Sequence, residues 1–254
     1  MTPLERLAQF QEENGYWIGG TWYPRVTKII SIKAKPALYR FYGDAESFEN
    51  GKEIAERAAE EGTLIHSTAQ ALLLGKTPLI PQELAPAFQK LQEFLDTTPI
   101  FTSPEYIERK VVHRHYRYAG TADALVTIGG KFGVLDIKTS SGIFREFGLQ
   151  TAAYLAALKE EFPSLTTRWI LRIDQVRTCA VCNATERQKG GTRRITTKRK
   201  KSCPEHDHQW TDAQGIVELR ELPYWKYDFN AFLSAKYLWE WEYAHWLRKI
   251  GYFD

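Results

Sequence analysis

The sequence predicts an α/β or α+β fold in which helices flank a central mixed β-sheet. Apolar residues recur at helical spacing over residues 51–75, and from residue 105 the period changes to the alternation typical of strands. The predicted order is helices, three strands, a helix, two strands and a helix, which suits a mixed sheet packed against helices. At 254 residues the chain can bury a full core, as one large domain or two small ones.

The N-terminal half is expected to be mostly helical after an irregular start. Residues 1–50 are predicted to form an aromatic arm, with a hairpin or loop near Gly19 and Gly20. Residues 51–75 are predicted to be a helix that Gly62 kinks or divides and Gly75 caps. Residues 86–98, "PAFQKLQEFLDTT", are predicted to form a second helix.

The C-terminal half is expected to supply the sheet. Residues 105–140 are predicted to form three antiparallel strands, with the tight turn "GGK" between the second and third. A helix over 145–160 should precede strands at 167–176 and 215–223, and a long aromatic helix should close the chain over 227–250. Trp22 and Tyr23 are candidates to stack on unpaired bases. The helical spacing of Trp239, Tyr243 and Trp246 favours a core position instead.

Composition narrows the class of protein. Hydrophobic content of 43% and charged content of 26% are typical of a soluble globular protein. A net charge of +3 gives no global basic field, so any affinity for nucleic acid must come from local patches. No run approaches the roughly 20 apolar residues of a membrane span, and the N-terminus lacks an apolar signal core. We therefore expect a cytoplasmic or other intracellular protein without a membrane partner.

Charged residues occur where a buried strand is predicted. In "GVLDIKTSSG", Asp136 and Lys138 fall on one face of the strand, because side chains alternate. The hairpin should bring Asp123 of the preceding strand next to Asp136. Two adjacent carboxylates suit Mg²⁺ or Mn²⁺, and a nearby lysine could orient water or stabilise charge on a phosphate. The alternative is a cross-strand salt bridge with one spare carboxylate.

Four segments together resemble the RecB-like, exonuclease V-like branch of the PD-(D/E)XK nuclease superfamily. They are "GTLIHSTAQAL", "AGTADAL", "VLDIKTS" and "LQTAAYLAAL", and the resemblance covers roughly residues 50–160. A more distant similarity to exonucleases of the mitochondrial genome maintenance type lies in "YPRVTKIIS", where Arg25 stands at the serine position.

The resemblance implies a restriction-endonuclease-like core over residues 51–254. By it, His66, Asp123, Asp136 and the backbone carbonyl of Ile137 bind Mg²⁺ or Mn²⁺, and Lys138 completes the catalytic set with the two aspartates. Gln150 and Tyr154 would contact nucleic acid. The implied function is metal-dependent hydrolysis of single-stranded DNA or duplex ends, as an exonuclease in recombination, repair or replication. The alternatives are a non-catalytic DNA-binding module or a zinc-centred interaction protein on a nuclease-like scaffold.

A second candidate metal site lies in an insertion over residues 177–210. Cys179 and Cys182 form a C-x-x-C pair, and Cys203 with His206 forms a C-x-x-H pair, with His208 as the alternative fourth ligand. Thiolates and imidazole in two short pairs suit structural Zn²⁺, while free thiols on a loop are the alternative. Three cysteines are too few for a four-cysteine iron–sulfur cluster.

The loop that zinc would close is strongly basic. If its ends are fixed by a metal, it is a candidate phosphate-contacting finger; a solvated charge run is the alternative. The candidate DNA contacts are Arg187, Arg193, Arg194, Lys198, Arg199 and Lys200.

Overall fold

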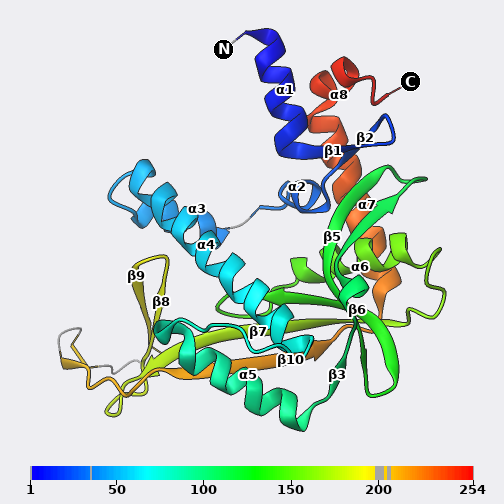
Figure 1. Ribbon diagram of the computed structural model, residues 1–254. Coiled ribbons are helices and arrows are strands. Elements are labelled where there is room, and N and C mark those ends of the chain that lie inside the picture. Colours follow the sequence, from blue (N-terminus) through cyan, green and yellow to red (C-terminus); the bar gives the residue numbers. More distant parts are fainter. Residues whose placement is uncertain (1, 35, 198–202, 205–206, 254) are drawn as a thin grey trace.

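The computed structural model has a central mixed β-sheet flanked by helices, as the sequence predicts (Figure 1). It describes residues 2–34, 36–197, 203–204 and 207–253. The α-helices are α1 Pro3–Asn14, α2 Val26–Ile30, α3 Pro36–Asp44, α4 Phe48–Leu73, α5 Ala85–Thr97, α6 Glu146–Leu158, α7 Trp225–Glu242 and α8 Ala244–Ile250. Two short 3-10 helices are η1 Gln82–Leu84 and η2 Pro104–Tyr106. The strands are β1 Gly15–Ile18, β2 Thr21–Pro24, β3 Ile100–Phe101, β4 Ile107–His113, β5 Tyr118–Ile128, β6 Lys131–Lys138, β7 Thr167–Thr178, β8 Thr185–Lys189, β9 Thr192–Thr196 and β10 Gln214–Glu221.

The main sheet combines antiparallel and parallel pairs. Strands β3 and β4 both pair with β5, and β5 pairs antiparallel with β6. Strand β6 then pairs in parallel with β7, which pairs antiparallel with β10. A parallel pair needs a long crossover connection, and α6 supplies it between β6 and β7. The sheet therefore places α6 next to the strands that carry Asp123, Asp136 and Lys138.

Each face of the sheet packs against helices. On one face, Ile65 of α4 and Leu91 of α5 pack in a cluster that includes Leu135 and Leu171 of the sheet. The cluster on the other face includes residues of α2, α6 and α7 together with strand residues such as Leu125 and Val134. Since apolar burial is the main stabilising contribution to folding, this packing fixes α4 and α6 around the ends of β5 and β6.

The N-terminal residues are more regular than the sequence suggested. Helix α1 begins with a capping box, in which the Thr2 hydroxyl accepts from the backbone of Glu5 and the Glu5 carboxylate accepts from the backbone of Thr2. Together with Pro3 at the first turn, this is a helix-start signal within "MTPLE". Trp22 and Tyr23 are 1% and 7% exposed, so the expectation that they stack on bases is wrong.

Two helix boundaries differ from expectation. Helix α4 runs through Gly62 without interruption, because its buried residues, including Ile54, Ile65 and Ala69, keep one helical face from end to end. Gly75 has φ +70° directly after this helix, as a C-terminal cap requires. The predicted final helix is instead divided at Tyr243 into α7 and α8.

Packing of aromatic side chains accompanies the division of the final helix. The rings of Tyr243 and Trp246 lie 5.5 Å and 5.6 Å from the ring of Phe10 in α1. Trp239 is 1% exposed, and Tyr243 and Trp246 are half-buried against the same core, in line with the expected core positions. Within the described part of the chain, none of the helices combines the length and the apolar character needed to cross a membrane.

The predicted insertion contains a β-hairpin. Strands β8 and β9 pair antiparallel, and the turn between them consists of Gly190 and Gly191, both at positive φ. This hairpin extends from the end of β7 toward α4 (Figure 1). A methyl group on Gly190 would lie 2.4 Å from the carbonyl oxygen of Ile54, so only glycine permits the hairpin tip to approach α4 this closely.

Candidate functional site

The β5–β6 hairpin brings Asp123 and Asp136 together, as predicted. Its two-residue turn is Gly129–Gly130, both at positive φ, and the ladder ends at the pair Ala124 and Leu135. Asp123 and Asp136 are the next residues along each strand. The carboxylate of Asp123 turns toward β6, where Oδ2 accepts a hydrogen bond from the backbone N–H of Ile137 at 2.6 Å.

Asp136 is the most deeply buried charged group of the site. It is 0% exposed, and its Oδ2 lies 2.6 Å from Nζ of Lys138, which confirms that the two side chains share a face. Burial raises the pKa of Asp136 to about 6; attraction to Lys138 opposes this, and repulsion from Asp123 adds to it. The site therefore holds negative charge that a bound cation would stabilise.

Helix α6 supplies an amide that links the acid and the base. Gln150 donates from Nε2 to Asp136 Oδ1 at 3.0 Å and accepts from Nζ of Lys138 at 3.2 Å. Gln150 Nε2 also lies 3.2 Å from the hydroxyl of Tyr154, whose side chain is buried. Burial raises the pKa of Tyr154, so this hydroxyl stays protonated. Gln150 thus contacts the candidate catalytic residues Asp136 and Lys138 directly, which the sequence did not predict, and Tyr154 reaches them through Gln150.

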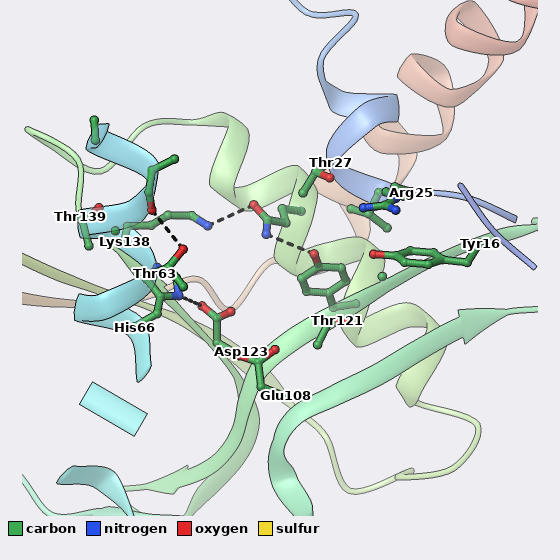
Figure 2. Close-up of a pocket in the computed structure, with 17 residues that line it drawn as sticks. Tyr16, Arg25, Thr27, Thr63, His66, Glu108, Thr121, Asp123, Lys138 and Thr139 are labelled. Carbon is green, nitrogen blue, oxygen red and sulfur yellow. Dashed lines mark hydrogen bonds and ion pairs between the residues drawn. The ribbon is translucent and has the colours of Figure 1, made fainter. Parts of the chain in front are cut away.

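Helix α4 presents His66 to the same site (Figure 2). Nδ1 of His66 lies 3.4 Å from Asp123 Oδ2. Glu108, at the start of β4, lines the same cavity, and Gln70 of α4 donates to its carboxylate. Glu108 has φ +50°, an uncommon backbone conformation for a residue with a side chain. The resemblance to the nuclease family extends to "IERKVVHRHYRYAGTAD", with Glu108 at the start of the strand pair that leads into the site, and the cavity lining agrees with that place.

A cavity of about 480 Å³ lies between α4, the β-strands and α6, and the site residues that line it are His66, Glu108, Asp123, Lys138, Gln150 and Tyr154. Tyr16 and Arg25 from the N-terminal segment line its other end, where the Arg25 guanidinium lies 4.4 Å from the centre of the Tyr16 ring. The open cavity presents the Asp123 carboxylate, the His66 imidazole and the Lys138 ammonium to a ligand, and the Asp136 carboxylate is buried behind them. Two carboxylates and an imidazole are a donor set that suits Mn²⁺ or Mg²⁺.

The donors of this set are not gathered as they would be around an ion. Among the described residues, the ligand atoms of His66, Asp123 and Asp136 do not all lie within 4.8 Å of one another. A second group, of three cysteines and one histidine, does meet that distance and is described below. Lys138 and Gln150 engage both carboxylate oxygens of Asp136. The chemistry of the donors fits a divalent ion, whereas their present spacing reflects pairing with lysine.

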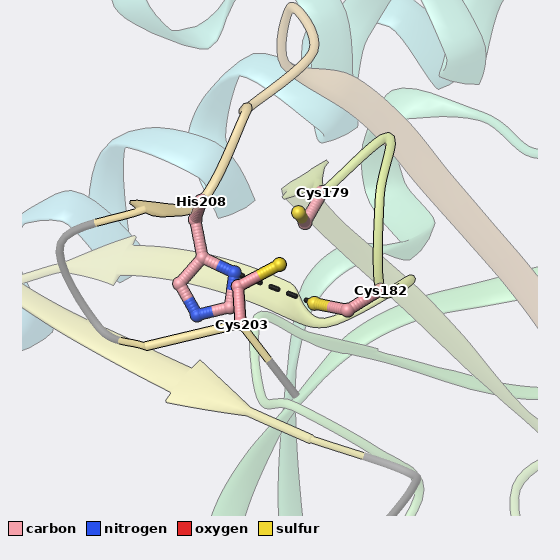
Figure 3. Close-up of side chains that lie close together, drawn as sticks. All are labelled: Cys179, Cys182, Cys203 and His208. Atoms are coloured by element: carbon pink, nitrogen blue, oxygen red, sulfur yellow. Dashed lines mark hydrogen bonds between the residues drawn. The ribbon is translucent and has the colours of Figure 1, made fainter. Parts of the chain in front are cut away.

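The cysteine–histidine cluster forms at the base of the inserted hairpin (Figure 3). Its members are Cys179, Cys182, Cys203 and His208, and their ligand atoms all lie within 4.8 Å of one another. Cys182 Sγ lies 3.4 Å from Nδ1 of His208. The histidine of this cluster is thus His208, which the sequence offered as the alternative to His206. His206 lies outside the described residues. A Cys₃His cluster of this size could hold a metal such as zinc.

Thiol acidities in this cluster favour a bound cation. Burial opposes ionisation of Cys179, but hydrogen bonds from the backbone of Cys182 and from His208 outweigh it and lower the pKa to about 6. Burial and the neighbouring thiols raise the pKa of Cys203 to about 11. Three ionised thiols so close together would repel one another, and a divalent metal removes that repulsion. None of the three cysteines is disulfide-bonded.

The basic residues of the hairpin have different surroundings. Arg187 donates from Nε to both oxygens of Asp174 at 2.9 Å and from Nη2 to the carbonyl of Thr139 at 2.6 Å. Arg193 pairs with Glu186. Arg194 is exposed and forms no ion pair with any described residue. Lys198, Arg199 and Lys200, the other predicted DNA contacts, lie outside the described residues.

Comparison with known proteins adds no assignment. No protein-family model matches the sequence, and no curated protein matches it either.

Proposed function

We propose that the chain is a metal-dependent nuclease that hydrolyses DNA phosphodiester bonds, with a restriction-endonuclease-like core of the RecB-like branch. The observation that supports this most strongly is the meeting of Asp123, Asp136 and Lys138 where the pairing of β5 with β6 ends, beside His66 and Gln150. These five residues come from four separate segments of the chain. His66, Asp123, Lys138 and Gln150 line one open cavity, and Asp136 is buried directly behind Lys138 and Gln150. A simple cross-strand salt bridge would not require an imidazole and a glutamine at the same place.

The roles of the residues follow from their positions. His66, Asp123, Asp136 and the carbonyl of Ile137 would hold Mg²⁺ or Mn²⁺. When bound, such an ion supplies Lewis-acid stabilisation of the negative charge that builds up on the phosphate. The Lys138 ammonium would orient the attacking water and balance the negative charge of the phosphate. Gln150, which accepts a hydrogen bond from Lys138 Nζ, would hold that ammonium in position. The protonated hydroxyl of Tyr154 would donate to a phosphate oxygen.

We further propose that Cys179, Cys182, Cys203 and His208 bind a structural Zn²⁺. The insertion between β7 and β10 has few apolar residues, so its hairpin needs another source of stability at its base. A zinc-centred interaction protein remains the second candidate function, and the compact Cys₃His cluster is the observation that favours it.

Hydrolysis of end-labelled DNA separates these functions. Purified protein is incubated with single-stranded and blunt duplex DNA in Mg²⁺, in Mn²⁺ and in EDTA. A nuclease gives metal-dependent products, and the ladder of end-labelled fragments gives its polarity. A protein that binds DNA in a gel-shift assay but releases no product in either metal would be a DNA-binding module. One that does neither would support the interaction protein.

A further inference from the structure

A second cavity, of about 660 Å³, lies next to the candidate active site. The two cavities share His66, Lys138, Thr139 and Gln150 among their lining residues, so they form one continuous cleft. The second cavity is bounded by α3 and α4, by the segment that follows β6, and by the β8–β9 hairpin. A strand whose phosphate lies at Lys138 would therefore have its neighbouring nucleotide in this second cavity.

The walls of the second cavity differ in chemistry. One side presents Leu38 and Phe41 of α3 and, after β6, Phe144 and Phe147. Phe144 is 44% exposed, a large apolar surface for a side chain that lines a cleft. The hairpin contributes the cations Arg187, Lys189 and Arg194. An apolar aromatic wall beside a cationic wall suits a ligand with a flat ring and a negative charge.

Hydrogen bonds to α4 and to Thr139 hold the β8–β9 hairpin in place as one wall of the second cavity. The backbone N–H of Gly190 donates to Glu61 at 3.2 Å, and Arg57 donates to the carbonyl of Gly190 at 3.2 Å. Lys189 donates to the carbonyl of Thr139 at 2.9 Å, as Arg187 also does. These contacts hold Arg187 and Lys189 against the protein, whereas Arg194 is exposed and forms no ion pair with any described residue, so it is the described hairpin cation best able to meet a phosphate.

We propose that the second cavity binds an unpaired nucleotide adjacent to the scissile phosphate, with its base against Phe144 and its phosphate at Arg194. This inference rests on the proposed nuclease function and assigns to it the residues that would hold a nucleotide next to the scissile phosphate. In a duplex, base faces are covered by stacking and pairing, so they cannot contact an aromatic wall. An unpaired base can, and such stacking contributes about 1–3 kcal/mol per base.

Two substitutions test the two walls separately. Phe144→Ala should weaken binding of a labelled oligothymidine about tenfold, equivalent to about 1.4 kcal/mol, without changing the salt dependence. Arg194→Gln should weaken it too and also flatten the log–log salt slope by about 0.7. Binding is followed by fluorescence anisotropy in Ca²⁺, and blunt-duplex affinity should stay unchanged in both variants.

Matched controls lie outside the cleft. Phe101→Ala removes a phenylalanine of β3 that is even more exposed than Phe144, and Lys226→Gln removes an exposed cation from α7; both should bind oligothymidine as the unmodified protein does. Phe144→Tyr keeps an aromatic ring and should retain affinity, and thermal unfolding of Phe144→Ala at the unmodified temperature excludes misfolding as the cause of a loss. The inference is overturned if Phe144→Ala and Arg194→Gln bind oligothymidine normally, or if they lose single-strand and duplex affinity equally.

Cleavage by the unmodified protein distinguishes this inference from the proposed function. If the protein cleaves DNA but neither substitution alters binding, only the second-cavity assignment fails. If both substitutions weaken oligothymidine binding while the unmodified protein releases no product in Mg²⁺ or Mn²⁺, the cavity assignment stands and the nuclease proposal fails.

Discussion

Replacing Asp136 by asparagine should make the metal-free protein more stable at neutral pH. Burial raises the pKa of this carboxylate from an ordinary 3.8 to about 6. Between these two values the folded protein binds more protons than the unfolded chain, so the free energy of unfolding falls as pH rises through that window. Asparagine keeps the shape of the side chain and the contact with Gln150 while it removes the charge.

The expected gain follows from the difference in pKa. A tenfold change in proton affinity corresponds to about 1.4 kcal/mol, so the ionised carboxylate costs at most about 3 kcal/mol above pH 6. This figure already includes the attraction to Lys138, which lies 2.6 Å away and opposes the shift. We expect a gain of about 2–3 kcal/mol at pH 7.5, or about 4–12 °C in Tm for a chain of this size.

Denaturant unfolding in EDTA from pH 4 to pH 8 measures this gain, with both proteins equally stripped of zinc. The difference in free energy of unfolding between Asp136→Asn and the unmodified protein should reach its largest value above pH 6 and should shrink toward zero as pH falls to about 4. Added Mn²⁺ should then stabilise the unmodified protein and not Asp136→Asn, because a ligand that binds only the folded state raises its stability. A variant that is less stable than the unmodified protein at pH 7.5, or a difference independent of pH, would refute the reasoning.

Three further substitutions probe the remaining contacts. Lys138→Ala should lower single-turnover cleavage far more than metal affinity, since lysine is not a ligand; lost metal binding with normal turnover at saturation would contradict this. Cys182→Ser should release zinc, detected by native mass spectrometry, and weaken DNA binding while cleavage of a short substrate at low salt persists; unchanged affinity and salt slope after zinc loss would show that the insertion does not contact DNA. Arg187→Gln should destabilise the fold by about 1–3 kcal/mol in denaturant unfolding, because the buried Asp174 loses one of its two charged partners and keeps only Arg172. Unchanged stability with a flattened salt slope would instead assign Arg187 to phosphate binding.

Local patterns in the sequence were enough to predict the centre of the candidate site. The alternation around Asp136 and Lys138 and the Gly129–Gly130 turn determine which side chains meet across the β5–β6 hairpin. The short spacing of Cys179 and Cys182 likewise predicts one half of the cysteine–histidine cluster. In each case the interacting residues are close in sequence, so period and turn chemistry are sufficient.

Contacts that depend on packing between distant segments could not be predicted in this way. Gln150 reaches Asp136 only because α6 crosses back over β6, and Arg187 is held by Asp174 on a different strand. An isolated charge run cannot show which of its members already has a partner. Spacing also allows either His206 or His208 beside Cys203, and only the turn of the chain before β10 brings His208 into the cluster.

Cleavage of end-labelled DNA by Asp136→Ala in saturating Mn²⁺ tests the central claim most directly. Circular dichroism and thermal unfolding first establish that the variant is folded, as removal of a buried, repelled carboxylate allows. The unmodified protein should release labelled products, and the folded variant should release none. Product formation by the metal-saturated variant at the unmodified rate would contradict the assignment of this site as the nuclease centre.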